Sequence, residues 1–284
     1  EISGANPREI AADFDRSPSR LIWAEDNSGV YFTSQDRGTS NLYFAPLRGN
    51  TRKVTDGNHM LMVSDISRTG LATGTLTDPQ NPADIITFMV SRPAIRKLTN
   101  VNDDVLYNVS LGEVEEVWYK SVDDFDIQGW LVKPPDFDPG KKYPMILVIH
   151  GGPHSMSNVG FNFTWQHHAA EGYLVLYTNP RGSSGYGSAF GNAIKNDYPN
   201  KDYHDLMNGV DEVIRRGYVD ENNLFVYGGS GGGVLTAWIV GHTDRFAAAS
   251  VNFPVTNWLS FVGTTDGVSW YRNFEHYPWD DPSE

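Results

Sequence analysis

The 284-residue sequence predicts an α/β fold, with a mostly parallel sheet covered by helices on both faces and preceded by the last blades of a β-propeller. Three observations predict it. Short β-like runs separated by turn residues fill residues 1–114, a continuous apolar run begins at Tyr143, and helical and apolar segments alternate after it. We therefore expect a partial propeller of about two to three blades at 1–114 and a sheet-and-helix domain at 115–284.

A weak internal repeat supports blades in the first domain. Leu42-Tyr43-Phe44 is echoed by Ile86-Thr87-Phe88, and Arg52-Lys53-Val54-Thr55 by Arg96-Lys97-Leu98-Thr99, in both cases 44 residues later. Propeller blades of four strands recur at about 40–50 residues. Chance similarity between two β-hairpins is the alternative, but the constant offset favours blades. A closed propeller needs at least about four blades, so this one would be incomplete.

Residues 115–284 alternate between strand and helix patterns. A hairpin is expected at 115–120 and 127–132, and buried strands are expected at 143–149, 173–177 and 224–227. Between the last two strands, Leu206, Val210 and Val213 share one face of a helix, with Asp202 and Asp205 mostly off that face. A helix at 233–242 and a strand near 246–251 complete the pattern, which is typical of a parallel sheet with helices on both faces.

The composition excludes several classes of function. Acidic residues outnumber Lys and Arg by 35 to 22, which argues against nucleic acid as a partner. No apolar run approaches the roughly 18 residues of a membrane-spanning helix, so we expect no membrane partner. Without cysteine there are no disulfides, thiolate catalysis or Cys-rich zinc sites, and the histidines show no metal-ligand spacing. We therefore expect no cofactor and no metal. The lack of cysteine does not fix the compartment, and with no recognisable signal peptide we expect the cytoplasm.

The strongest chemical motif is Gly-x-Ser-x-Gly at Gly228, Ser230 and Gly232. An apolar strand precedes it and a helix follows it, which is the context of a nucleophile elbow, a strained strand–turn–helix that lifts a serine hydroxyl above a sheet. Its glycines, including Gly229, are expected because side chains would clash in so tight a turn. The hydroxyl also lies at a helix N-terminus, where developing negative charge is favoured. We therefore predict that Ser230 is a nucleophile.

A phosphate-binding loop is the competing interpretation of the same glycines. Walker A needs a Lys after its last glycine, and none follows Gly233. The dinucleotide fingerprint needs glycine at its first, third and sixth positions. Counted from Gly228 the third position is Ser230, and counted from Gly229 the sixth is Val234. The elbow is therefore the better interpretation.

A second glycine-rich segment, His150-Gly151-Gly152-Pro153, directly follows the predicted strand at 143–149. A glycine pair there turns a backbone N–H toward the space above the elbow. An oxyanion hole needs such a donor together with the N–H of the residue after the nucleophile. We predict that Gly152 and Gly231 are these donors and that His150 shapes the loop. A plain Gly-Pro turn at the end of a strand is the alternative interpretation.

Several motifs in order along residues 115–284 resemble the catalytic domain of the prolyl oligopeptidase family of serine peptidases, most of all its acylaminoacyl-peptidase and bacterial dipeptidyl-peptidase-like branch. The matching segments are 149–153, 179–187, 201–206, 217–220, the elbow and 241–246. The resemblance implies a seven-bladed propeller followed by an α/β-hydrolase domain. The residue after the nucleophile is commonly Tyr in the family, whereas it is Gly231 in this sequence. The backbone N–H that the oxyanion needs is present in either case. Arg181 is expected to brace the 179–187 loop by hydrogen bonds.

The resemblance also implies a catalytic Asp and His after two further strands, beyond the segment that resembles 258–284. After Ser230 the only histidines are His242, near the end of the elbow helix, and His276, in an aromatic stretch. Neither is expected to be the base. We therefore expect a fragment truncated at both ends, weakly active or inactive alone, whose missing C-terminal segment carries the triad Asp and His. Its strand near 247–252 would expose an apolar edge.

Two classes of function follow from these observations. The first is a serine-type peptidase that hydrolyses short peptides through an acyl-enzyme on Ser230, with a carboxylesterase as the alternative that uses the same chemistry. The second is a non-catalytic fragment or binding module without turnover. The intact elbow favours catalysis, whereas the absent Asp and His favour the second class for this chain alone.

Overall fold

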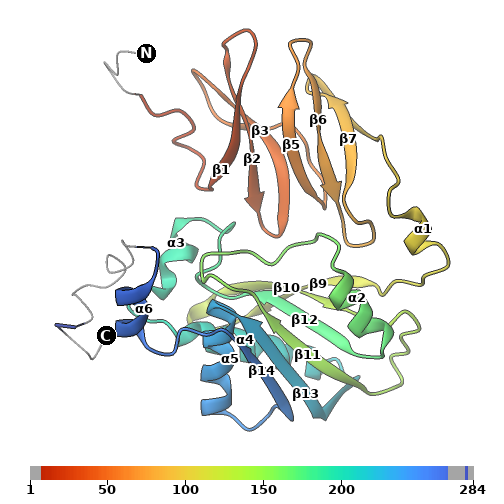
Figure 1. Ribbon diagram of the computed structural model, residues 1–284, viewed down its shortest axis with the longest axis vertical. Coiled ribbons are helices and arrows are strands. Elements are labelled where there is room, and N and C mark those ends of the chain that lie inside the picture. The colour runs from red at the N-terminus through yellow and green to blue at the C-terminus, as the bar shows by residue number, and fades with distance from the viewer. Residues whose placement is uncertain (1–7, 268–278, 281–284) are drawn as a thin grey trace. The chain divides into compact units, whose positions relative to one another are not determined.

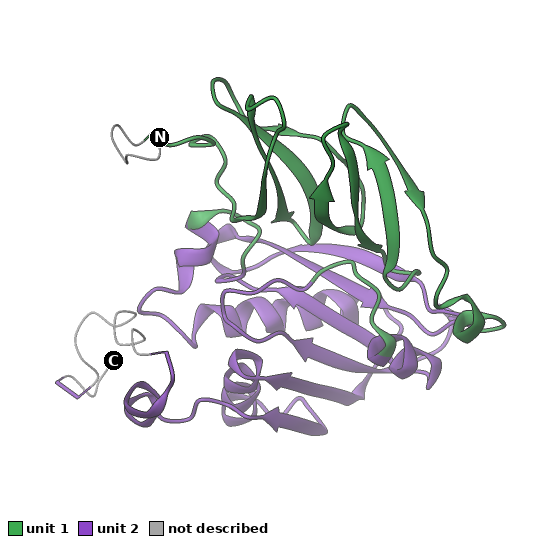
Figure 2. Ribbon diagram, turned by 45° about the horizontal axis from the view of Figure 1, so that its top comes forward, with its two compact units in different colours: residues 1–110, 158–163, 184–188 green, residues 111–157, 164–183, 189–284 purple. Residues whose placement is uncertain are grey.

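The computed structural model describes residues 8–267 and 279–280. The chain forms two compact units, which Figure 2 shows in separate colours. Unit 1 holds residues 1–110 together with two short loop segments, 158–163 and 184–188. Unit 2 holds residues 111–157, 164–183 and 189–284.

Unit 1 is built from two antiparallel meanders. The strands of the first are β1 (Pro18–Trp23), β2 (Gly29–Asp36), β3 (Thr39–Pro46) and β4 (Arg52–Lys53). The strands of the second are β5 (Met60–Ile66), β6 (Leu71–Thr77), β7 (Asp84–Met89) and β8 (Arg92–Lys97). A parallel pairing of Ser40 with Met60 joins β3 to β5, and the short helix α1 (Asp103–Leu106) follows β8.

The sequence repeat falls on equivalent strands of the two meanders. Leu42 lies in β3 and Ile86 in β7, each the third strand of its meander. The two Arg-Lys pairs likewise lie in the fourth strands, β4 and β8. Leu42 and Ile86 are both buried in one apolar cluster with Leu61 and Val63 of β5. The propeller expected from this repeat, and the domain boundary between residues 114 and 115, stay predictions.

Unit 2 is centred on a six-stranded mixed sheet (Figure 1). In spatial order its strands are β14 (Ala248–Asn252), β13 (Val219–Gly229), β11 (Tyr143–Ile149), β12 (Leu174–Asn179), β10 (Asp126–Val132) and β9 (Val114–Lys120). The strands from β14 to β12 pair in parallel, and the β9–β10 hairpin adds to β12 in the antiparallel sense. Parallel neighbours need crossover connections, and these connections contain the helices.

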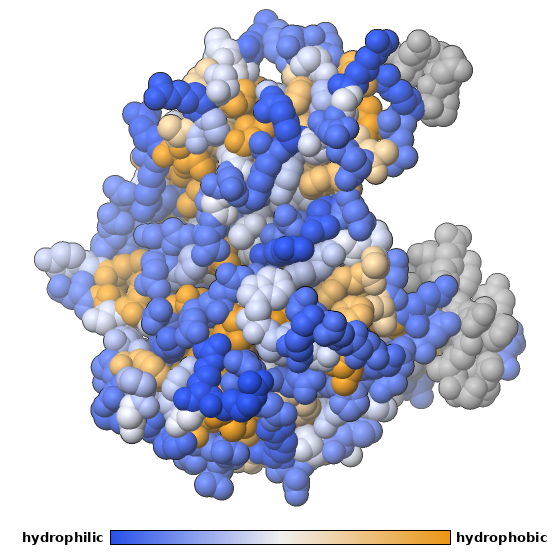
Figure 3. Space-filling model, turned by 180° about the vertical axis from the view of Figure 1, so that it is seen from behind, coloured by the Kyte–Doolittle hydropathy of each residue, from blue (hydrophilic) through white to orange (hydrophobic). Residues whose placement is uncertain are grey.

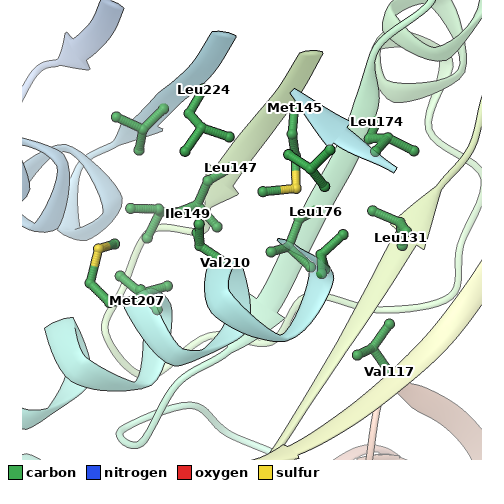
Figure 4. Close-up of a cluster of buried hydrophobic side chains, with 14 of the residues drawn as sticks. Val117, Leu131, Met145, Leu147, Ile149, Leu174, Leu176, Met207, Val210 and Leu224 are labelled. Atoms are coloured by element: carbon green, nitrogen blue, oxygen red, sulfur yellow. The ribbon is translucent and has the colours of Figure 1, made fainter. Parts of the chain in front are cut away.

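Helices cover both faces of this sheet. The described helices after β9 are α2 (Phe163–Ala170), α3 (Ser188–Gly191), α4 (Lys201–Arg215), α5 (Gly231–His242) and α6 (Trp258–Thr264), with the 3₁₀ turns η1 (Val122–Asp124) and η2 (Asn192–Ile194). Met207 and Val210 of α4 pack against Leu147 and Ile149 of β11 (Figure 4). Successive strand residues point to opposite faces. Leu176 joins this cluster, whereas the next residue of β12, Tyr177, stacks on Trp165 of α2 with ring centroids 4.0 Å apart. The predicted sheet with helices on both faces is therefore confirmed.

Strand β14 forms one edge of the sheet. Among the described strands it pairs only with β13, and its residues are exposed apart from the half-buried Asn252. Val251 is 38% exposed there, as expected for an apolar edge. Elsewhere, hydrophilic side chains cover most of the face shown in Figure 3, with apolar residues scattered among them. No helix in the described part of the chain is long and apolar enough to cross a membrane.

Candidate active site

Ser230 lies in a tight turn between a strand and a helix. Strand β13 ends at Gly229, helix α5 begins at Gly231, and Ser230 between them has φ 58° and ψ −121°. A residue other than glycine is rarely found at such a positive φ, and strained backbone of this kind clusters at functional sites. The Ser230 N–H donates to the Asn252 carbonyl at the end of β14, 3.1 Å away. This geometry is that of a nucleophile elbow.

The glycines around Ser230 allow backbone segments to approach more closely than side chains would permit. A Cβ on Gly232 would lie 2.2 Å from the carbonyl oxygen of Ile149, and a Cβ on Gly228 would lie 2.4 Å from that of Gly232. A Cβ on Gly229 would lie 2.7 Å from the ring of Phe253. Real Cβ atoms do not reach such distances from backbone oxygens. The turn therefore closes directly onto the end of β11 because it consists of glycine on both sides of Ser230.

The loop after β11 lies beside the Ser230 side chain. A Cβ built on Gly151 would be 3.4 Å from the Cβ of Ser230 and 4.0 Å from its Oγ. Gly152 has φ +120°, a conformation that favours glycine. The backbone of Gly152 faces Gly231, since a Cβ on Gly231 would lie 2.6 Å from the Gly152 oxygen and 3.0 Å from its nitrogen. The structure thus brings together Ser230, Gly152 and Gly231, as well as the N-terminus of α5, which favours negative charge.

The loop that contains Gly151 and Gly152 is tied to the loop that follows β12. His150 Nε2 lies 3.0 Å from Ser183 Oγ, and His154 Nδ1 donates to the carbonyl of Gly182, 2.9 Å away. At the end of β12, the Asn179 side chain accepts the N–H of Ser157 at 2.7 Å and donates to the carbonyl of Ser157 at 2.9 Å. The role of His150 in shaping this loop, which the sequence predicts, agrees with these contacts.

Arg181 anchors the second loop to the body of unit 2. Its side chain is 2% exposed, and its guanidinium donates twice to the carboxylate of Asp205 in α4, at 2.9 Å each. The Arg181 N–H donates to the same carboxylate, and the guanidinium also contacts Asp123 and the carbonyl of Val122. The ring of Phe125 lies 4.4 Å from the guanidinium carbon. The predicted bracing of the 179–187 loop by Arg181 is therefore confirmed.

Asp202 and Asp205 differ from the sequence-based expectation. Both are buried, at 1% and 0% exposure, although they were expected mostly off the buried face of the helix. Asp205 is buried because Arg181 and Ser121 bond its carboxylate. Asp202 accepts the N–H groups of Asn200 and Tyr203 at 2.8 and 3.1 Å. Burial raises the pKa of Asp202 from 3.8 to about 7, and the Asp205 carboxylate adds to the shift.

The chain is similar to known proteins. Residues 159–284 match the sequence model of the prolyl oligopeptidase family. The chain is 37% identical over 251 residues to the uncharacterized peptidase YuxL of Bacillus subtilis, a match that covers 87% of this chain and 38% of that protein. It is 31% identical over 280 residues to dipeptidyl-peptidase 5 of Porphyromonas gingivalis, a match that covers 97% of this chain and 40% of that protein. The chain belongs to the prolyl oligopeptidase family.

Solved structures of peptidases are similar to this prolyl oligopeptidase-family chain. An acylaminoacyl peptidase of Pyrococcus horikoshii matches with a TM-score of 0.84 and 28% identity, over 97% of this chain and 45% of that one. An acylaminoacyl peptidase in complex with Z-Gly-Gly-Phe-chloromethyl ketone matches with a TM-score of 0.86 and 28% identity, over 99% of this chain and 44% of that one. The chain thus spans about two fifths of the length of the curated relatives that it matches.

The histidines of this prolyl oligopeptidase-family chain have other partners than Ser230 wherever the structure gives their hydrogen bonds. Within residues 8–267 and 279–280, no hydrogen bond joins a histidine to the Ser230 hydroxyl. His242 lies at the far end of α5, about 18 Å along the helix from Ser230, and its Nδ1 donates to the Trp238 carbonyl, 2.7 Å away. His276 lies outside the described residues. The described residues also contain no group of three or more potential metal ligands.

The contact between Gly231 and Gly152 predicts opposite effects for two alanine substitutions in α5. Gly231→Ala places a Cβ 2.6 Å from the Gly152 oxygen, so the loop must shift and the free energy of unfolding should fall by about 1–3 kcal/mol. Gly241→Ala is the matched control, because no atom lies within 4 Å of its Cβ. It should raise the free energy of unfolding by about 0.5–1 kcal/mol. Urea unfolding measures both, and equal stability of the two variants would contradict the close contact.

The raised pKa of Asp202 predicts a pH-dependent gain in stability for Asp202→Asn. The folded state keeps the Asp202 proton up to about pH 7, whereas the unfolded chain releases it near pH 4. The wild-type protein therefore loses stability as the pH rises from about 4 to 7. Asparagine keeps the acceptor oxygen without the charge.

Relative to the wild type, Asp202→Asn should therefore gain on the order of 2 kcal/mol between pH 5 and pH 8 in the free energy of unfolding. Urea unfolding at the two pH values measures this difference. Asp65→Asn, at an exposed position in β5, controls for the loss of one acidic side chain. A gain that is the same at pH 5 and pH 8 would contradict the raised pKa.

Proposed function

We propose that this chain is the nucleophile-bearing part of a serine peptidase that cleaves short peptides. The observation that carries the proposal is the strained backbone of Ser230, with φ 58°, on a turn that also brings Gly152 beside Gly231. Membership of the prolyl oligopeptidase family supports peptide hydrolysis. The names of the relatives, a dipeptidyl-peptidase and acylaminoacyl peptidases, support short peptides as substrates.

In the proposed reaction, Ser230 Oγ attacks the carbonyl carbon of the scissile peptide bond while a histidine base takes the hydroxyl proton. The carbonyl oxygen becomes an oxyanion and accepts the N–H groups of Gly152 and Gly231. The tetrahedral intermediate then collapses, the C–N bond breaks, and the protonated histidine donates its proton to the leaving amine. Water, activated by the same base, hydrolyses the acyl-enzyme and restores Ser230.

The electrostatic part of this mechanism belongs to the chain itself. In this proposal the N–H groups of Gly152 and Gly231 and the N-terminus of the 12-residue helix α5 stabilise the oxyanion. Removing one such donor from an oxyanion hole costs about 10²–10³ in kcat in enzymes of this kind. We propose that the base and its orienting carboxylate come from residues outside this chain. We also propose that the two meanders of unit 1 belong to a propeller that restricts entry to short peptides.

Ser230→Ala in the full-length gene product tests the proposal. The hydrolysis of short peptide p-nitroanilides should fall by about 10³-fold or more, because the covalent step is lost. Ser64→Ala, at an exposed serine of β5, is the matched control and should keep wild-type activity. Peptide hydrolysis at the wild-type rate in the Ser230→Ala variant would contradict the proposal. Wild-type turnover of p-nitrophenyl esters without turnover of any peptide would favour a carboxylesterase instead.

A further inference from the structure

Helix α5 begins with three consecutive glycines directly after Ser230. Gly231, Gly232 and Gly233 form its first turn. Glycine has more backbone freedom than any other residue and is a poor helix former, so this sequence defines the turn only loosely by itself. The proposed oxyanion donor, the N–H of Gly231, lies in this turn. Contacts from outside the turn therefore determine how well that N–H is fixed.

Tyr198, in the loop before α4, provides such a contact. Its hydroxyl donates to the carbonyl oxygen of Gly231, 3.1 Å away. Burial raises the pKa of Tyr198, and the nearby Asp202 adds to the shift, so the hydroxyl stays protonated and remains a donor. A carbonyl oxygen has two lone pairs, and one of them is enough for the hydrogen bond from the N–H four residues later in the helix. The phenol thus bonds to the turn without breaking the helix.

The Gly231 N–H lies between two bonded groups of the backbone. On one side, the N–H of Ser230 donates to the Asn252 carbonyl, 3.1 Å away. On the other side, the carbonyl of Gly231 accepts the Tyr198 hydroxyl. The N–H of Gly231 belongs to the planar peptide unit that joins Ser230 to Gly231. Hydrogen bonds on both sides therefore limit how far this unit rotates.

Tyr198 is itself held in place. Its ring packs against the apolar cluster that β11, β13 and α4 share, and the centroid of the ring lies 6.5 Å from that of Trp258 in α6. Two residues after Tyr198, the Asn200 N–H donates to the buried carboxylate of Asp202, 2.8 Å away. The hydroxyl therefore reaches Gly231 from a segment whose own position is defined.

We propose that Tyr198 is a positioning residue: its hydroxyl fixes the first turn of α5 and so holds the Gly231 N–H in the direction of the oxyanion. The inference rests on the proposed function, because it assumes that this N–H binds the oxyanion. A residue with a Cβ restricts its own backbone, whereas Gly231 does not, so the restriction comes from the Tyr198 hydroxyl. In this role Tyr198 acts through Gly231 and exchanges no proton with the substrate.

Tyr198→Phe in the full-length gene product tests this role, because it removes the hydroxyl and keeps the ring. An oxyanion donor acts on the charge of the transition state, so loosening it lowers kcat and leaves substrate binding nearly unchanged. Loosening the donor also costs less than removing it. With short peptide p-nitroanilides, kcat should fall by about 5–50-fold, with KM within about twofold of the wild-type value.

Tyr143→Phe is the matched control for the loss of a bonded tyrosine hydroxyl. The Tyr143 hydroxyl accepts the Asp138 N–H, 2.8 Å away, at the start of β11 and so at the opposite end of this strand from Gly152. The control should keep the wild-type kcat. A Tyr198→Phe variant with the kcat of this control, or with a rise in KM alone, would overturn the inference.

Ser230→Ala separates the two claims. Peptide hydrolysis at the wild-type rate in that variant defeats the proposed function. Loss of hydrolysis in Ser230→Ala together with a fully active Tyr198→Phe variant defeats only this inference.

Hydrogen exchange of the full-length gene product gives a readout that does not depend on turnover. Peptides that contain residues 231–236 should exchange faster in Tyr198→Phe than in the wild type, because the hydrogen bonds of this turn open more often. Peptides from residues 206–213 of α4 should keep the wild-type exchange rate, which shows that the variant is folded. Unchanged exchange at 231–236, or equally faster exchange in both segments, would overturn the inference.

Discussion

The candidate site depends on a backbone approach that side chains would prevent. At two positions of the elbow, Gly228 and Gly232, a Cβ would lie 2.4 and 2.2 Å from a backbone oxygen, that of Gly232 and that of Ile149 in β11. Because these residues are glycine, α5 begins directly against the end of β11. That contact places the Ser230 hydroxyl, the α5 N-terminus and the Gly152 backbone in one small volume at the carboxyl ends of parallel strands.

A second constraint keeps that volume organised. The loop next to Ser230 has little regular structure of its own, and it is held by hydrogen bonds to the end of β12 and to the loop after β12. The Asn179 side chain, the Gly182 carbonyl and the Ser183 hydroxyl supply these contacts, and Arg181 fixes the same segment to Asp205 of α4. A buried ion pair adds little net stability, but it defines one geometry, since either charge without its partner is costly to bury. The precision of the site is therefore set by a charge pair that does not contact Ser230.

Local patterns predicted much of unit 2. Apolar runs located β11 and β12 because these strands are buried on both faces, the run at 224–227 located β13, and the spacing of Leu206, Val210 and Val213 located α4. The elbow followed from Gly228 to Gly232 in the context of a strand and a helix. These features depend on residues that are close in sequence, so periodicity and motif are enough to find them.

The supporting network could not be predicted in the same way, because its partners are far apart in the chain. Asp205 is bonded by Arg181, 24 residues away, and by Ser121, 84 residues away. In the sequence pattern of α4, Asp205 lies mostly off the apolar face, and this favoured the interpretation that its side chain is exposed. The sequence indicated a buried carboxylate only through Arg181. This residue is a cation in a loop between buried strands, and a buried cation needs an anionic partner. Its identity as Asp205, and the pairing of His150 with Ser183, required the fold.

The most direct test of this account is a crystal structure of the full-length gene product after reaction with a fluorophosphonate. We expect a phosphonyl group on Ser230 Oγ, with its oxygen about 2.7–3.1 Å from the backbone nitrogens of both Gly152 and Gly231. A phosphonyl group on another residue, or an oxygen directed away from these two nitrogens, would contradict it.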